Sequence, residues 1–216
     1  MKKFNLIVLI SLLLSSCNTQ DNKPKSKEVK IGNQIWMTEN LNVETFRNGD
    51  IVPEAKSAKD WLYAAKNKKP AWCYYENDLS NGKCYGKLYN WYALTDSRGL
   101  APKGWHIPTY AEWSTLIDFL GGWENALSKM KSPSGWDNEG NGSNKSGFFA
   151  LPGGFRYDDG SFSDIGFMGY WWSATDTNTR LPETAYTINL DSFEGGGVTD
   201  YNLYKNNGLS IRCIKN

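Results

Sequence analysis

The stretch PTYAEWSTLIDFLGG, residues 108–122, specifies the best-defined local structure of the chain. Thr109 at the N-cap and Glu112 three residues later have the spacing of a capping box, in which each side chain bonds the other residue's backbone N–H. Gly121 and Gly122 favour the backbone conformation that ends helices. We therefore expect a helix between Thr109 and the glycine pair. Its apolar side chains recur at helical spacing on one face: Trp113, Leu116, Ile117 and Leu120.

The chain N-terminal to this helix predicts one strand and two more helices. Residues 30–37 alternate loosely between polar and apolar and predict the first strand. Ser57 and Asp60 repeat the capping-box spacing, which predicts a short helix that ends before Pro70. Residues 85–94 carry apolar side chains at helical spacing and predict a further helix.

The chain beyond residue 132 changes to short aromatic segments separated by Gly, Asn, Asp and Ser. We expect strands at residues 148–157, 170–174, 185–190 and 209–214, and turns at residues 137–144 and 158–160. Helices early and strands late indicate the α+β class with a twisted antiparallel sheet.

The N-terminal residues have the pattern of a secretion signal. Lys2 and Lys3 precede an apolar run at residues 4–14 that is too short to span a bilayer, and Leu14-Ser15-Ser16-Cys17 follows. These four residues resemble the bacterial lipobox, in which a peptidase cuts before the cysteine and the new N terminus is acylated. We expect a signal peptide at residues 1–16 and lipidation of Cys17. An ordinary secretory signal is the alternative.

The residues after Cys17 predict how the protein is anchored. Residues 17–29 are polar and charged and predict a flexible tether, and residues 30–216 predict a single domain. Each buried methylene of an acyl chain contributes about 0.8 kcal/mol, so two or three chains anchor a protein firmly. Asn18 rather than Asp follows Cys17, which favours the outer membrane over the inner one. We expect the domain in the cell envelope, facing the periplasm or the cell surface.

Charge and composition limit the partners. The formal net charge is +1, and removal of Lys2 and Lys3 with the signal leaves about −1, so we expect no nucleic-acid partner. The 10 Trp, 12 Tyr and 9 Phe suit either a rigid core or a surface that stacks on sugars. We expect no cofactor and no metal site, because His106 is the single histidine and has no ligand spacing around it. We interpret His106 as packed beside Trp105 and bonded to the backbone.

Three cysteines remain once Cys17 carries lipid. Cys73, Cys84 and Cys213 allow one disulfide and one free thiol in an oxidising compartment. A Cys73–Cys84 bond closes a short loop, whereas a Cys73–Cys213 bond ties the early chain to its last strand. The residues alone leave both pairings open.

The sequence also offers candidate ligand-binding residues. Neighbours in a strand point to opposite faces, so Trp171 and Trp172 are both buried only if both faces of the sheet are covered. The alternative is that one tryptophan is exposed to a ligand. We take Tyr170, Trp171, Trp172 and Arg156 as the candidate ligand-binding set.

Several motifs together resemble the Fibrobacter succinogenes major paralogous domain family, over residues 30–216. They are WCYYEND at 72–78, YGKLYNWY at 85–92, GLAPKGWHIP at 99–108, AEW at 111–113, LPGGFR at 151–156, GYWWSAT at 169–175 and SIRC at 210–213. The resemblance implies a C-type lectin-like fold, in which helices precede twisted strands and the first and last strands pair. It favours Cys73–Cys213 over Cys73–Cys84 and implies no catalytic residue. The calcium-binding tripeptides of sugar-binding C-type lectins are absent.

These observations lead to one main expectation of function and two alternatives. We expect a lipid-anchored, non-catalytic module that binds a glycan or an envelope protein. The first alternative is an enzyme on the C-type lectin-like scaffold, related to formylglycine-generating enzymes, that uses Cys84 as a free thiol. The second is a structural component of a surface complex.

Overall fold

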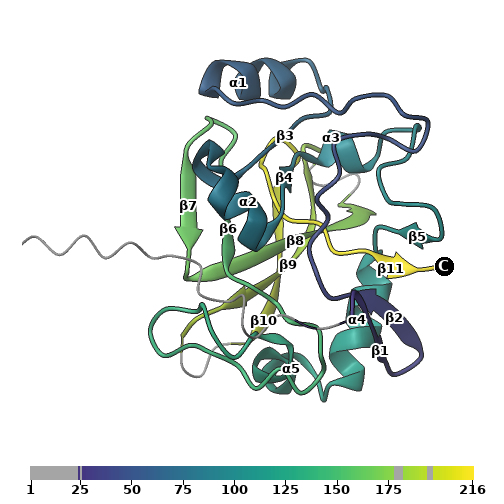
Figure 1. The fold of residues 1–216 in the computed structure, drawn as a ribbon, viewed down its shortest axis with the longest axis vertical. Helices are drawn as coiled ribbons and strands as arrows, with labels where there is room; N and C mark the ends of the chain where they lie inside the picture. Colours follow the sequence, from purple (N-terminus) through teal and green to yellow (C-terminus); the bar gives the residue numbers. More distant parts are fainter. Residues whose placement is uncertain (1–23, 25, 178–181, 194–196) are drawn as a thin grey trace, which may run out of the picture.

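The computed structural model describes residue 24 and residues 26–177, 182–193 and 197–216. The helices are α1 Ala58–Lys66, the short 3₁₀ helix η2 Tyr75–Asn77, α2 Leu79–Tyr85, α3 Trp91–Leu94, α4 Tyr110–Phe119 and α5 Trp123–Met130. The strands are β1 Glu28–Ile31, β2 Gln34–Met37, β3 Trp72–Cys73, β4 Leu88–Tyr89, β5 Trp105–His106, β6 Gly153–Arg156, β7 Phe162–Ile165, β8 Met168–Asp176, β9 Thr184–Asp191, β10 Val198–Tyr204 and β11 Ile214–Lys215. The expected α+β class is confirmed (Figure 1).

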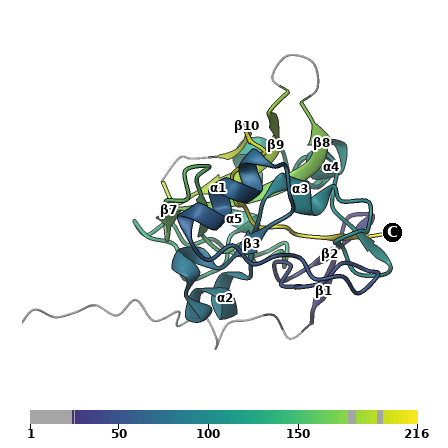
Figure 2. The ribbon, with the colours of Figure 1, turned by 90° about the horizontal axis from the view of Figure 1, so that it is seen from above.

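Three sheets organise the described residues. The largest has the order β10-β9-β8-β6-β7 and is antiparallel except for the β6–β8 contact. A second has the order β1-β2-β11-β5, and β3 pairs with β4. Ile214 of β11 lies opposite both Trp36 of β2 and His106 of β5, so the expected pairing of early and terminal strands is confirmed. Figure 1 places α1 at one end of the molecule, and both views place the C terminus near β2 (Figures 1 and 2).

Helix α4 forms as its capping residues predict. Thr109 Oγ1 accepts from the backbone N–H of Glu112, and the Glu112 carboxylate accepts from the N–H of Thr109 at 2.8 Å. The helix ends at Phe119 with Leu120 as its C-cap, and Gly121 follows with a φ of 101°, which suits glycine. The same reciprocal bonds between Ser57 and Asp60 begin α1, so both predicted helices are confirmed.

The helix predicted over residues 85–94 is confirmed only over its last four residues. Helix α2 ends at Tyr85, and Gly86 takes a φ of 78° that breaks the helix. Leu88 and Tyr89 then form β4, in which both side chains are buried, and Tyr89 exchanges backbone bonds with Leu209. Of the spaced apolar residues, Leu88 lies on the strand β4, and the later ones lie on the helix α3.

The later strands follow the prediction in part. Strands β8 and β9 contain the predicted segments 170–174 and 185–190, and the turn at 158–160 connects the antiparallel strands β6 and β7. Within 148–157 only Gly153–Arg156 is strand, and Phe149 has a left-handed φ of 56°. Within 209–214 the regular strand begins at Ile214, whereas Leu209 and Ser210 form single bridges.

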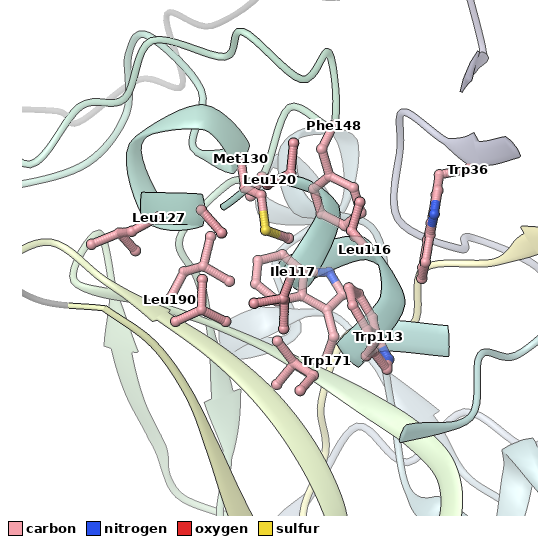
Figure 3. Packing of buried hydrophobic residues seen from close by; sticks show 14 of the residues in the cluster. Trp36, Trp113, Leu116, Ile117, Leu120, Leu127, Met130, Phe148, Trp171 and Leu190 are labelled. Atoms are coloured by element: carbon pink, nitrogen blue, oxygen red, sulfur yellow. The ribbon is translucent and has the colours of Figure 1, made fainter. Parts of the chain in front are cut away.

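The core covers both faces of the large sheet. On one face α4 and α5 direct their apolar side chains toward Trp171 and Leu190 (Figure 3). Trp36 and Trp113 join this cluster with ring centroids 4.7 Å apart. A second cluster packs on the opposite face around Trp172, with contributions from the loops before β11. The central strand β8 therefore lies between two apolar layers.

Candidate binding surface

The four predicted ligand-binding residues lie in the core. Trp171 and Trp172 are both 0% exposed, and Arg156 and Tyr170 are buried as well. The indole of Trp171 donates to Asn40 Oδ1 at 2.9 Å. The alternative that one of the two tryptophans is exposed is wrong, because an apolar cluster covers each face of β8.

Arg156 has a structural environment. Its guanidinium stacks 4.7 Å from the rings of both Trp61 and Phe162 and donates to the carbonyl oxygens of Ala55 and Gly160. Arg156 is 1% exposed, so its guanidinium is not presented to a ligand. Hydrogen bonds and two aromatic faces together stabilise a charge that burial alone would disfavour.

The same arrangement recurs and explains much of the tryptophan content. Other buried cations each lie over an aromatic ring, at centroid distances between 4.2 and 4.9 Å. Buried charge needs compensation, and the ring face supplies part of it. The pairs are Lys87 with Trp72, Lys131 with Trp136, Lys205 with Trp91 and Arg212 with Phe148.

The cysteines do not pair as predicted. Cys73 and Cys213 are buried free thiols, and burial raises the pKa of each to about 12. Both predicted bonds of Cys73 are therefore wrong; Cys73 and Cys213 belong to separate core clusters. Cys84 is half-buried and is not among the free thiols. Cys17 lies outside the described residues.

His106 bonds side chains and not the backbone. Its Nε2 lies 2.7 Å from Glu112 Oε1, and its Nδ1 lies 2.8 Å from Asn216 Oδ1. The second carboxylate oxygen of Glu112 holds the N terminus of α4. Neither partner is a serine, threonine or cysteine, and the two bonds connect β5 with α4 and with Asn216.

Two exposed tyrosines lie close to Tyr170. Tyr157 is 42% exposed and Tyr201 is 52% exposed. The ring of Phe155 lies between Tyr157 and Tyr170. Its centroid is 4.4 Å from the ring centroid of Tyr157 and 4.8 Å from that of Tyr170. Both exposed tyrosines also act electrostatically on the Tyr170 hydroxyl.

Strand pairing places Tyr201 on the same sheet face as Tyr170. Tyr201 lies opposite Thr187, and Thr187 lies opposite Trp172. Trp172 is two residues from Tyr170, so their side chains share a face. Thr187 is fully buried and donates to the Tyr201 carbonyl at 3.1 Å, which holds the edge strand β10 in place.

Asp164 completes this surface. Its Oδ2 accepts from the Tyr170 hydroxyl at 2.7 Å, and its Oδ1 accepts from Ser163 at 2.7 Å. Burial first, and then the Asp164 bond, raise the pKa of Tyr170. Asp164 also has a left-handed φ of 69°, a conformation that costs energy in a residue other than glycine. We call the exposed Tyr157 and Tyr201, together with the buried Tyr170 and its half-buried partner Asp164, the tyrosine surface.

Comparison with known proteins identifies the family. The model of the Fibrobacter succinogenes major domain matches residues 29–215. The chain belongs to this family. Neither a curated protein nor a solved structure matches the chain.

The Fibrobacter succinogenes major domain extends from β1 to β11 and contains both the buried cations and the tyrosine surface. The resemblance of the motifs to this family is thereby confirmed. Among the described residues there is no cluster of three or more His, Cys, Asp or Glu side chains that suits a metal ion. The candidate site of this family member is the tyrosine surface.

Proposed function

We propose that the protein is a lipid-anchored, non-catalytic binding module of the cell envelope that recognises a glycan or an envelope protein. The observation that carries the proposal is the exposure of Tyr157 and Tyr201 on one sheet face beside the Tyr170–Asp164 bond. A tyrosine ring offers an apolar face and a polar hydroxyl, a combination enriched at recognition surfaces.

The residues packed behind Tyr157 and Tyr201 support a role for the tyrosine surface in binding. Tyr157 packs on Phe155, and the strand that carries Tyr201 is held by buried Thr187. A ring that is already positioned loses little conformational entropy when a ligand stacks on it. The strained backbone of Asp164 suits a functional position as well, because strain persists only where the surroundings impose it.

The anchor and the scaffold form the rest of the proposal. Acyl chains on Cys17 and the tether at residues 17–29 attach the domain to the outer membrane, where it faces the periplasm or the cell surface. None of the described helices is long and apolar enough to cross a bilayer. The pairing of β2 with β11 and the helices packed beside a twisted sheet support a C-type lectin-like scaffold.

A cysteine enzyme on this scaffold has no supporting observation. The thiols of Cys73 and Cys213 are buried, and their pKa of about 12 keeps them protonated at neutral pH. Cys84, the residue on which that alternative depends, is not among the free thiols. A purely structural role in a surface complex is an outcome of the test below.

The test uses the mature chain without lipid, made as Cys17→Ser, on a broad glycan array and in crosslinking to envelope proteins. We expect a specific ligand whose binding is lost in Tyr157→Ser and Tyr201→Ser. Tyr63→Ser is the matched control, because Tyr63 is 58% exposed but lies on α1. If neither screen gives a ligand, or if the three variants behave alike, the proposal is wrong and the structural role is favoured.

A further inference from the structure

A small cleft of about 70 Å³ lies between segments that are distant in sequence. Residues 38–42, which follow β2, form one side, and Lys83 and Cys84 of α2 form another. Arg212, just before β11, also lines the cleft. The tyrosine surface contributes no residue to it, so the two sites are separate.

Arg212 is a buried cation without a counter-ion. It is 1% exposed, and no carboxylate lies within ion-pair distance of it among the described residues. Burial lowers its pKa to about 9, whereas the charge of Glu39 acts to raise it. Buried charges are usually paired, because removal from water is costly.

The other buried cations make the contrast clear. Lys205 pairs with Asp176 at 2.8 Å, and Lys87 pairs with Glu44 at 3.3 Å. Arg156 and Lys131 rely on carbonyl oxygens, as Arg212 does. Of these three, Arg212 is the one that borders the cleft.

One N–H group of the Arg212 guanidinium makes no hydrogen bond to the described residues. A guanidinium has five N–H groups. Nε and Nη2 each donate to Asn40 Oδ1, at 3.1 and 2.8 Å, and Nη1 donates to the carbonyls of Met37 and Phe148. These bonds use four N–H groups, and the second N–H of Nη2 has no acceptor among the residues with assigned positions.

We propose that the cleft binds a carboxylate group of a ligand, with Arg212 supplying the charge and the remaining Nη2–H. Arg pairs with planar carboxylates through charge-assisted hydrogen bonds. A cavity of about 10–15 Å³ already holds one water molecule, so the cleft has room for a group of carboxylate size. Glu39 and Lys83 are exposed residues of opposite charge that line the cleft, so the Glu39 carboxylate opposes a bound anion and the Lys83 amine favours it.

The inference does not depend on the tyrosine surface, and its test is separate. Acetate is titrated into the Cys17→Ser chain at constant ionic strength, and the side-chain NMR signals of Arg212 Nε–H and the Trp171 indole N–H are followed. Both groups donate to Asn40 Oδ1, so both report on the cleft. We expect saturable shifts of these two signals and none of the Trp61 indole, which bonds Asn206 instead.

Variants make the test decisive. Arg212→Gln should weaken acetate binding at least about tenfold, or about 1.4 kcal/mol. Because Arg212 is buried and its replacement also perturbs the core, Glu39→Gln is the second variant, and it should tighten binding by removing a competing charge. Lys66→Gln on α1 is the control and should change nothing. Absence of saturable shifts with acetate, saturation by inorganic phosphate alone, or a Glu39→Gln variant that binds no tighter would each overturn the proposal.

Discussion

The hydroxyl of Tyr170 donates a 2.7 Å hydrogen bond to Asp164, a residue held in the left-handed backbone region at a φ of 69°. The bond joins the central strand β8 to the edge strand β7 on the face where Tyr157 and Tyr201 are exposed. It fixes the position of Tyr170 and keeps its proton in place, because burial and the neighbouring carboxylate both raise the pKa of Tyr170.

This bond predicts a loss of stability in alkali. A raised pKa in the folded state means that the stabilisation is present below the unfolded pKa of about 10 and is lost as pH rises above it. Tyr170→Phe should make the fall in unfolding free energy above that pH shallower by up to about 1.4 kcal/mol per pH unit, which is the effect of one proton. Urea unfolding at a series of pH values measures it. An unchanged slope would contradict the assignment, and Tyr63→Phe on α1 is the control.

The environment of Arg156 predicts that lysine is a poor substitute. Lysine cannot stack a planar group between Trp61 and Phe162 while it donates to two separate carbonyls. Arg156→Lys should lower the unfolding free energy by about 2 kcal/mol, in the range for a broken buried hydrogen-bond network. Denaturant unfolding gives the value. Arg98→Lys, at the partly exposed Asp50 and Asp96 site, should cost far less, and equal costs would contradict the account.

The two buried thiols predict the behaviour of the cysteines. Cys73 and Cys213 should resist a thiol reagent in the native protein and react once it is unfolded without reductant. Mass spectrometry of the alkylated peptides identifies both sites. A peptide pair linked through Cys73 and Cys213 in the purified protein would show that the structure is wrong at these residues.

The cap of α4 predicts a measurable cost for its removal. Thr109→Ala deletes the side-chain acceptor for the N–H of Glu112 and should lower the unfolding free energy by about 1 kcal/mol. Thermal and urea unfolding both report it. Thr115→Ala, within the same helix at an exposed position, should have a smaller effect. If the two variants are equally stable, the cap does not contribute as proposed.

Local patterns predicted those parts of the fold that local bonds determine. The capping boxes that begin at Ser57 and Thr109 are bonds between residues three apart in the sequence. They do not depend on tertiary packing, so both helices were predictable. Helix α5 was missed because Gly122 precedes it at a φ of 87° and provides no side-chain cap. Strand β10 was missed because most of its residues are exposed or half-buried and show no regular alternation.

Tertiary contacts decided the rest. Alternation correctly placed Trp171 and Trp172 on opposite faces, but nothing local showed that the chain near Leu209 and Ile211 returns to cover the second face. One signal of the candidate site was present, since Phe155 and Tyr157 alternate toward the same face. Tyr201 had no such signal, because its position depends on pairing between β9 and β10.

The most direct test of the central proposal is cosedimentation of the Cys17→Ser chain with the envelope fraction of its host. The chain carries no lipid, so retention measures recognition by the domain. We predict that it sediments with the envelope and that the Tyr157→Ser/Tyr201→Ser double variant stays in the supernatant, while Tyr63→Ser still sediments. If the double variant sediments as well as the parent chain, the tyrosine surface is not the binding site.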